Sequence, residues 1–200
     1  MRLSMILLFC VSVCASAQGW IRSVGNSASY APSIAQGSIF VVFGYQLGPD
    51  QLVQAPKYPL ETALADTTVH VTVGGTTVLC PMVYTSYGQV AAILPSATPA
   101  GEGIVSITYR GQQTYPSTIT VVKNGFGIYT TSAVGSGPGS ITGADYALNT
   151  FAHAAKPRDL LVLWGTGLGP APGDDGAGPQ PGVQFDDVSV YIGNCACPLG

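Results

Sequence analysis

Residues 39–49 read IFVVFGYQLGP, and residues 160–170 read LLVLWGTGLGP. When the two stretches are aligned, Phe43 lies on Trp164, a glycine follows each ring, and both stretches end in Leu-Gly-Pro. The separation between the copies is the length of a small domain, far longer than the period of a solenoid repeat. We therefore predict two copies of one module, each opening on a buried apolar strand that ends in a glycine turn. In this interpretation Phe43 and Trp164 are core anchors at matching places.

The first copy continues as a series of short β-strands. Along residues 67–73, valines occupy one face and polar residues the other, which predicts a half-buried strand. Gly74 and Gly75 predict a two-residue hairpin, because the favoured turns need the positive φ that glycine adopts at little cost. The return strand is predicted at 76–84, with Pro81 at an edge or a bulge. Further strands are predicted at 38–43, 89–94, 103–110 and 118–122.

Strands this short, separated by turn signals about every eight to twelve residues, predict an all-β fold of the immunoglobulin-like sandwich type. Residues 19–32 and 44–60 are rich in turn formers and are predicted to be irregular. The second copy repeats the pattern only in part. Residues 188–192 repeat the valine strand, with Gly193-Asn194 at the hairpin, and the sequence ends soon afterwards. We expect tandem modules, the second incomplete: a signal peptide at 1–17, a first module at 18–123 and a second at 124–200.

Residues 1–17 are typical of a secretory signal peptide. Arg2 supplies the positive start, residues 3–13 are mostly apolar, and Ala15-Ser16-Ala17 forms a small-residue cleavage site before Gln18. The apolar run is too short to span a bilayer as a helix, and no later stretch is long and apolar enough to do so. We therefore expect a secreted, extracellular protein without a transmembrane segment.

The composition limits the classes of partner. Only 8% of residues are charged, and the chain has 26 glycines and 15 prolines. Because 46% of its residues are hydrophobic, it is nevertheless too apolar for a disordered protein. A net charge of −3 without a basic cluster argues against nucleic acid and anionic membranes as partners. After cleavage three cysteines remain, Cys80, Cys195 and Cys197. Their odd number indicates either unpaired thiols or a disulfide to a residue outside this sequence.

Several pieces of the chain, in their order and spacing, resemble one protein family. They are Ala28-Ser29-Tyr30-Ala31-Pro32, residues 37–44, Tyr84-Thr85-Ser86 with Gln89-Val90, Gly127-Ile128-Tyr129, residues 164–170 and residues 188–193. Together they are similar to an uncharacterised domain family at the C-termini of acidobacterial (Solibacter-type) secreted proteins, whose repeated halves look like IPT/TIG-type immunoglobulin-like modules. The chain departs from that pattern at Arg158, where glycine is usual. The resemblance implies the fold and implies no catalytic residue, because the family has no established activity.

No catalytic constellation stands out, so we expect a non-enzymatic protein without a cofactor. Residues 165–169 (GTGLG) look like a phosphate loop, but Pro170 and Pro172 prevent a helix from starting there to hold the anion. The alternative is a secreted hydrolase that uses His153 with a loop carboxylate, although no sequence motif identifies a nucleophile. Only two histidines are present, and the cysteines lack the usual zinc spacing, so a zinc site is not expected.

The remaining candidate site residues are loop carboxylates and loop tyrosines. Asp174 and Asp175 are weak calcium candidates, because Ca²⁺ prefers oxygen ligands, and the alternative is that they are solvated turn residues. Tyrosines beside loops can stack on sugars or fill a protein interface, or they can simply cover the ends of the sandwich. The candidates for a binding role are Tyr45, Tyr84, Tyr87 and Tyr115, with Tyr58 also in a loop. We therefore predict a secreted binding, adhesion or spacer protein whose partner is an extracellular protein or glycan.

Overall fold

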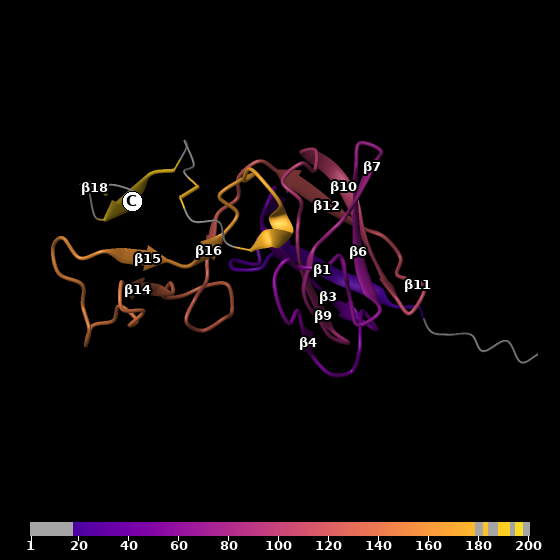
Figure 1. The fold of residues 1–200 in the computed structure, drawn as a ribbon, viewed down its shortest axis with the longest axis horizontal. Helices are drawn as coiled ribbons and strands as arrows, with labels where there is room; N and C mark the ends of the chain where they lie inside the picture. Colours follow the sequence, from indigo (N-terminus) through magenta and orange to yellow (C-terminus); the bar gives the residue numbers. More distant parts are fainter. Residues whose placement is uncertain (1–17, 179–181, 184–187, 193–194, 198–200) are drawn as a thin grey trace, which may run out of the picture.

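A sandwich of two β-sheets dominates the computed structural model, which describes residues 18–178, 182–183, 188–192 and 195–197 (Figure 1). The five-stranded sheet contains, in spatial order, β1 (Trp20–Asn26), β3 (Ile39–Tyr45), β9 (Gln89–Ile93), β8 (Met82–Thr85) and β4 (Val53–Gln54). The seven-stranded sheet contains β2 (Ser33–Ala35), β12 (Ser117–Val122), β10 (Gly101–Tyr109), β6 (Thr67–Val73) and β5 (Ala63–Leu64), with β7 (Thr76–Leu79) also on β6 and β11 (Gln112–Gln113) on β10. The protein is therefore all-β, as its short strands predict.

The β6–β7 hairpin forms as its sequence predicts. Burial alternates along β6, and its three valines point into the core. Gly74 and Gly75 have φ values of 56° and 83°, and Val73 pairs with Thr76 across them. The positive φ angles match the turn that the right-handed twist of two paired strands requires. The predicted two-residue hairpin is confirmed.

The return strand of this hairpin is divided between the two sheets. β7 ends at Leu79, and after Cys80 and Pro81 the chain continues as β8 in the five-stranded sheet. Proline has no N–H to extend a ladder, so Pro81 lies where the chain leaves one sheet for the other. The single strand predicted for residues 76–84 is therefore wrong, and its two parts lie in opposite layers.

β1 lies where the sequence predicts an irregular segment. It pairs with β3 from Trp20↔Tyr45 to Asn26↔Phe40, with a shift of register between Ile21 and Ser23. A bulge of this kind breaks the alternation of side chains along a strand, which conceals the strand from a period-two pattern. The prediction for residues 19–32 is therefore wrong over residues 20–26.

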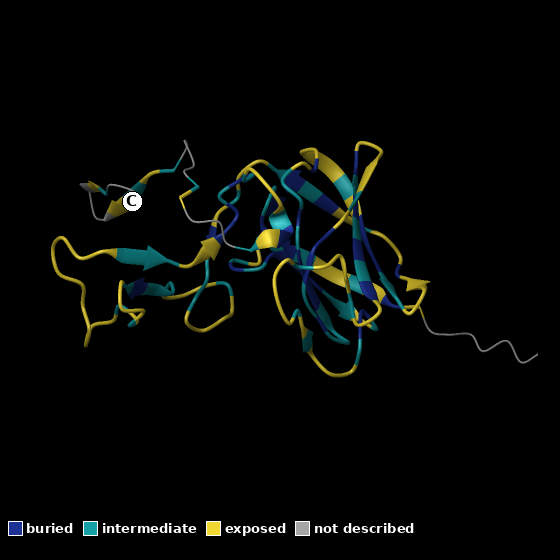
Figure 2. Ribbon diagram, viewed as in Figure 1, coloured by how far each residue is buried: buried dark blue, intermediate teal, exposed yellow. Residues whose placement is uncertain are grey.

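The hydrophobic core lies between the two sheets (Figure 2). Its largest fully buried side chains are Phe40, Ile34, Leu47, Met82, Leu94 and Ile107. Cys80 belongs to the same cluster, is fully buried and forms no disulfide. Burial raises the pKa of its thiol far above the usual range, because the thiolate would lose its hydration. Cys80 is thus a core residue.

The C-terminal segment forms strand pairs and, within the residues described, no second sandwich. The pairs are β13 (Gly127–Ile128) with β16 (Gly165–Thr166), β14 (Ile141–Gly143) with β15 (Leu161–Leu163), and β17 (Val190–Ile192) with β18 (Cys195–Cys197). β14 and β15 project to one side of the sandwich (Figure 1). The β17–β18 pair agrees with the predicted hairpin, whose turn at 193–194 lies outside the described residues, as does the signal peptide at 1–17. None of the described residues form a helix of the length and hydropathy that crossing a membrane requires.

The two aligned aromatic residues are not core anchors, contrary to the prediction. Trp164 is 43% exposed, and the residues of β15 are only half-buried, because among the described strands β15 pairs with β14 alone. In β3, alternation directs Phe40 and Val42 into the core, which leaves Phe43 half-buried on the opposite face. The two copies of the repeat therefore form similar strands that lie in different environments.

Hydrogen bonds fasten β16 and Gly125 to the sandwich. The fully buried Asn26 side chain donates to the carbonyls of Gly125 and Thr166 at 3.0 and 3.3 Å, and the Thr166 hydroxyl accepts from the Ile39 N–H at 2.9 Å. Gly167 has a φ of 98°, and a Cβ there would lie 2.4 Å from the Gly125 oxygen. The glycines of the GTGLG stretch therefore allow turns and close approach, as predicted.

Candidate functional site

Six aromatic residues lie on or beside the outer face of the five-stranded sheet. We call this surface the aromatic face; it comprises Trp20, Tyr30, Phe43, Tyr45, Tyr84 and Tyr87. Side chains alternate along a strand, so Phe43 and Tyr45 point away from the core that contains Val42. Trp20 is paired with Tyr45 across the strands and stacks against it on the same side.

Three of these rings form a contiguous cluster, the aromatic triad of Trp20, Tyr45 and Tyr87. The Trp20 and Tyr45 rings have centroids 6.1 Å apart and planes within 10° of parallel. Tyr87 meets Tyr45 edge-on at 5.2 Å and 69°. Trp20 and Tyr45 remain 47% and 55% exposed, which is high for rings that pack on each other. Exposed aromatic clusters of this kind mark interaction sites.

Tyr30 extends the aromatic face from a tight turn after β1. Its ring meets Phe43 edge-on at 5.5 Å, and its hydroxyl donates to the Ala133 carbonyl at 3.0 Å. Tyr30 has a φ of 57°, the left-handed region that a bulky residue occupies at a cost of roughly 1 to 3 kcal/mol. The turn passes directly over Gly25, where a Cβ would lie 2.8 Å from the Ala31 oxygen. The absent side chain of Gly25 therefore lets Tyr30 lie close against the sheet.

Tyr84 is the half-buried member of the aromatic face. Its hydroxyl accepts a hydrogen bond from the Gln89 side chain. Burial raises the pKa of Tyr84 to about 12; the nearby phenols of Tyr30 and Tyr129 add to the rise, and the bond from Gln89 opposes it. Tyr84 therefore keeps its proton at physiological pH and can act as a hydrogen-bond donor.

A groove of about 340 Å³ borders the aromatic face at the edge of the sheet. Its walls are β8 and β4, represented by Tyr84 and Gln54, and the loop after β4, represented by Lys57 and Tyr58. The Tyr58 ring is 56% exposed and packs on the backbone of Gly178, where a Cβ would lie 2.9 Å from the ring. This volume is within the usual range for small-molecule sites, roughly 300 to 1,000 Å³.

The structure brings together three of the four tyrosines that the sequence singles out. Tyr45, Tyr84 and Tyr87 belong to the aromatic face, whereas Tyr115 lies between β11 and β12 of the other sheet and is 67% exposed. Sequence reasoning missed Trp20 and Tyr30, because both lie in the segment predicted to be irregular. The feature that identifies Trp20 is its pairing with Tyr45. Because these residues are far apart in the sequence, no local pattern shows that pairing.

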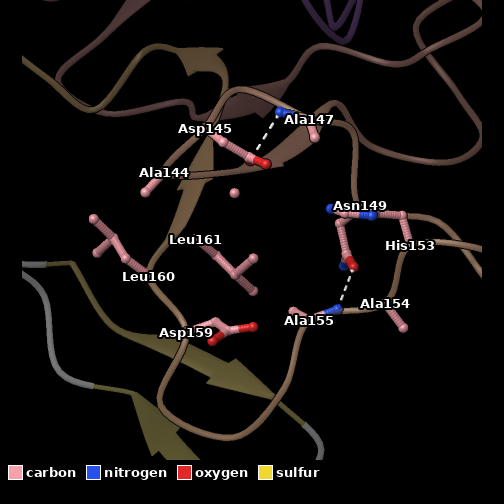
Figure 3. A pocket seen from close by; sticks show the side chains of 11 residues that line it. Ala144, Asp145, Ala147, Asn149, His153, Ala154, Ala155, Asp159, Leu160 and Leu161 are labelled. Atoms are coloured by element: carbon pink, nitrogen blue, oxygen red, sulfur yellow. Dashed lines mark hydrogen bonds between the residues drawn. The ribbon is translucent and has the colours of Figure 1, made fainter.

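The residues of the alternative hydrolase site, His153 with the carboxylates of Asp145 and Asp159, surround a pocket of about 280 Å³ (Figure 3). The carboxylates of Asp145 and Asp159 project from separate parts of its wall and accept hydrogen bonds from the backbone N–H groups of Ala147 and Lys156. His153 lies in an exposed turn. None of the described residues that line the pocket carries a hydroxyl or a thiol, so a serine- or cysteine-type nucleophile is not supplied there.

Asp174 and Asp175, the weak calcium candidates, lie at the start of the short 3-10 helix η1 (Asp175–Ala177). Asp174 accepts from the Gly176 N–H at 2.8 Å. The Asp175 carboxylate accepts from the N–H of Ser96 at 2.8 Å and also from its hydroxyl. Asp174 thus caps η1, and Asp175 joins η1 to the sandwich. Among the residues that the structure describes, no three His, Cys, Asp or Glu side chains form a group suited to a metal ion.

Comparisons with known proteins place the chain beside three solved structures from Bacteroides. No protein-family model matches the chain, and no curated protein matches its sequence. The structural matches are a protein of B. vulgatus provisionally named a bacterial DNA binding protein (21% identity, TM-score 0.37), an auxiliary nutrient binding protein of B. ovatus (16%, 0.33) and a provisionally named phosphatase of B. thetaiotaomicron (11%, 0.32). The matches cover 52%, 57% and 59% of this chain, which spans 47%, 23% and 22% of theirs. At these scores they carry no argument about function.

Proposed function

We propose that this protein is a secreted, non-enzymatic binding protein with an immunoglobulin-like sandwich, and that it holds an extracellular ligand on the aromatic face. The aromatic triad is the observation that carries the proposal. Its Trp20 and Tyr45 rings are about half-exposed although an apolar core lies directly beneath the same sheet. An aromatic ring that is left in contact with water gives up burial energy that a ligand can recover, at about 25 cal/mol per Å².

The lining of the C-terminal pocket supports the non-enzymatic part of the proposal. It offers no hydroxyl or thiol beside His153, and both neighbouring carboxylates accept backbone hydrogen bonds. Secretion is supported by the apolar N-terminal stretch and its small-residue cleavage site. A buried thiol at Cys80 is compatible with an oxidising exterior, because it is shielded from reaction.

The test is a binding screen with three single-residue variants. The purified mature protein is applied to arrays of extracellular glycans and to extracellular matrix proteins, and each ligand found is measured against Trp20→Ala, Tyr45→Ala and Tyr115→Ala. Truncation of a central aromatic residue typically costs about 2 kcal/mol or more, roughly thirtyfold in affinity. We expect that loss for Trp20 and Tyr45 and less than about twofold for Tyr115, which is exposed on the other sheet.

Two results contradict the proposal. If no ligand binds, the protein is a passive spacer. If a ligand binds equally well to the Tyr45→Ala variant and to the wild type, the binding surface lies elsewhere. Thermal unfolding of each variant serves as the control, since removing half-exposed rings should leave the sandwich folded.

A further inference from the structure

The aromatic triad and the groove beside β4 belong to the same side of one sheet. The triad spans β1, β3 and the turn before β9, and the groove is bounded by β8 and β4. Between them Gln89 on β9 donates a hydrogen bond to Tyr84, which lines the groove. Neighbouring strands lie about 4.8 Å apart, so the four steps from β1 to β4 alone take about 19 Å across the strands, and Tyr45 and Tyr84 also lie at different levels along them. A ligand that reaches both features must be extended.

The chemistry of this surface is aromatic, amide-rich and uncharged. The members of the aromatic face are neutral, and Gln89 lies among them. Of the described residues that line the groove, Lys57 is the only charged one, and Gln54 supplies an amide there. Rings offer a flat apolar surface, and amides and phenols offer donors and acceptors beside it. Sugar rings match this arrangement, because each has a C–H face and a rim of hydroxyl groups.

Other extended ligands match the surface less well. A polyanion would be repelled by a chain of net charge −3 and would find only Lys57 in the groove. Protein interfaces are likewise rich in tyrosine and tryptophan, but a stable one buries about 1,000 Å² or more in a broad patch, whereas the triad and the groove offer a line of contacts from β1 to β4. We propose that the ligand is an uncharged polysaccharide whose chain crosses the sheet from the aromatic triad to the Tyr58 groove. This inference rests on the proposed function, since it names the ligand of the same surface.

Named residues would contact the polysaccharide at each point along its path. Trp20 and Tyr45 hold sugar rings by their faces at one end. Tyr84 donates its phenolic proton to a sugar oxygen midway, since its hydroxyl accepts from Gln89 and remains protonated. Tyr58 receives a further ring at the groove, where the backbone of Gly178 supports it from behind.

The experiment measures the dependence of affinity on chain length. The mature protein is run through gels that contain hydroxyethyl cellulose, galactomannan, xylan or polygalacturonate, and the retarding polymer is then replaced by its disaccharide and hexasaccharide in calorimetry. We expect retardation by at least one neutral polymer, at low salt and at high salt alike. The hexasaccharide should bind at least about tenfold more tightly than the disaccharide, because it reaches both features.

Variants at the two ends separate the possible outcomes. We expect Tyr45→Ala to weaken both oligosaccharides and Tyr58→Ala to weaken the hexasaccharide alone, about fivefold or more. Tyr115→Ala is the control, and an unchanged melting temperature shows that Tyr58→Ala remains folded. If the hexasaccharide binds equally to Tyr58→Ala and to the wild type, the extended path is wrong. If only polygalacturonate or a protein binds, and Tyr45→Ala abolishes that binding, the polysaccharide inference is overturned while the proposed function stands. If nothing binds, both fall.

Discussion

Replacing Asn26 by alanine should loosen the C-terminal segment from the sandwich. Asn26 is fully buried at the end of β1. Its amide nitrogen donates to the Gly125 and Thr166 carbonyls, and its oxygen accepts from the N–H groups of Ala28 at 2.8 Å and Ser29 at 3.1 Å. One side chain thus closes the turn that carries Tyr30 and also holds the strand that contains Thr166.

The expected loss of unfolding free energy is about 3 kcal/mol. Each hydrogen bond contributes about 0.5 to 1.5 kcal/mol net, and a buried group that loses its partner costs more than one that water can reach. Three of the bonds measure 3.1 Å or less, and the fourth, to Thr166, is long at 3.3 Å and counts least. The estimate therefore lies in the lower half of the range of about 2 to 6 kcal/mol for four bonds.

Urea unfolding, followed by tryptophan fluorescence, measures the effect on stability. Amide hydrogen exchange measures where the effect lies, and we expect faster exchange at Ala28 and Ser29, whose N–H groups lose their acceptor. Asn124→Ala is the matched control, because this exposed side chain makes one bond, to the Leu168 carbonyl at 2.7 Å. We expect its cost to be below about 1 kcal/mol.

One result would refute this reasoning. If Asn26→Ala changes the unfolding free energy by no more than Asn124→Ala does, the four bonds do not hold the two parts together. Asn26→Asp refines the test, since it keeps the acceptor for Ala28 and Ser29 but sets an anion against the Gly125 and Thr166 carbonyls. We expect it to release the C-terminal strand while the turn remains closed, which exchange at each site distinguishes.

Three further predictions concern other parts of the structure. Asp175→Ala should lower the unfolding free energy by about 2 kcal/mol, because Ser96 loses two charge-assisted hydrogen bonds, and the Ser96 amide should exchange faster. Folding raises the pKa of Tyr84 from 10.0 to about 12, so the native state binds more protons and stability should fall as pH rises from 10 to 12. After discounting for half-exposure, the loss is about 1 kcal/mol; Tyr84→Phe should abolish it in urea titrations at pH 9 and pH 12. In a variant with serine at positions 195 and 197, Cys80 should react with a thiol reagent only after denaturation, and reaction in the native state would contradict its burial.

Local sequence patterns predict the parts of the fold that local physics decides. Side chains alternate along any strand, so the valines of residues 67–73 indicate a half-buried strand wherever that strand lies. A two-residue turn needs positive φ, so Gly74 and Gly75 locate the hairpin. These properties depend on the residues themselves and hardly on their partners.

Contacts between distant residues decide the rest. The break at Pro81 depends on which sheet has room for β8, and β1 is recognisable only through its pairing with β3. Trp164 and Phe43 have similar local sequences, and only packing decides that both lie outside a core. Arg158 is a further case in which the structure supplies the reason. Glycine is usual at this position in the family that the chain resembles, and the backbone there has a φ of 80°, which glycine adopts without strain.

The candidate site follows this division as well. Its composition is written in the sequence, since the tyrosines at 45, 84 and 87 follow strand ends and turns. These tyrosines lie on one face with Trp20 only because β1, β3, β9 and β8 belong to one sheet, and no local pattern specifies that order. The sequence by itself determined an all-β chain of short strands with aromatic residues at their ends. Only the tertiary structure decided which of these aromatic residues meet, because sheet order is selected by burial of the shared core between strands far apart in the chain.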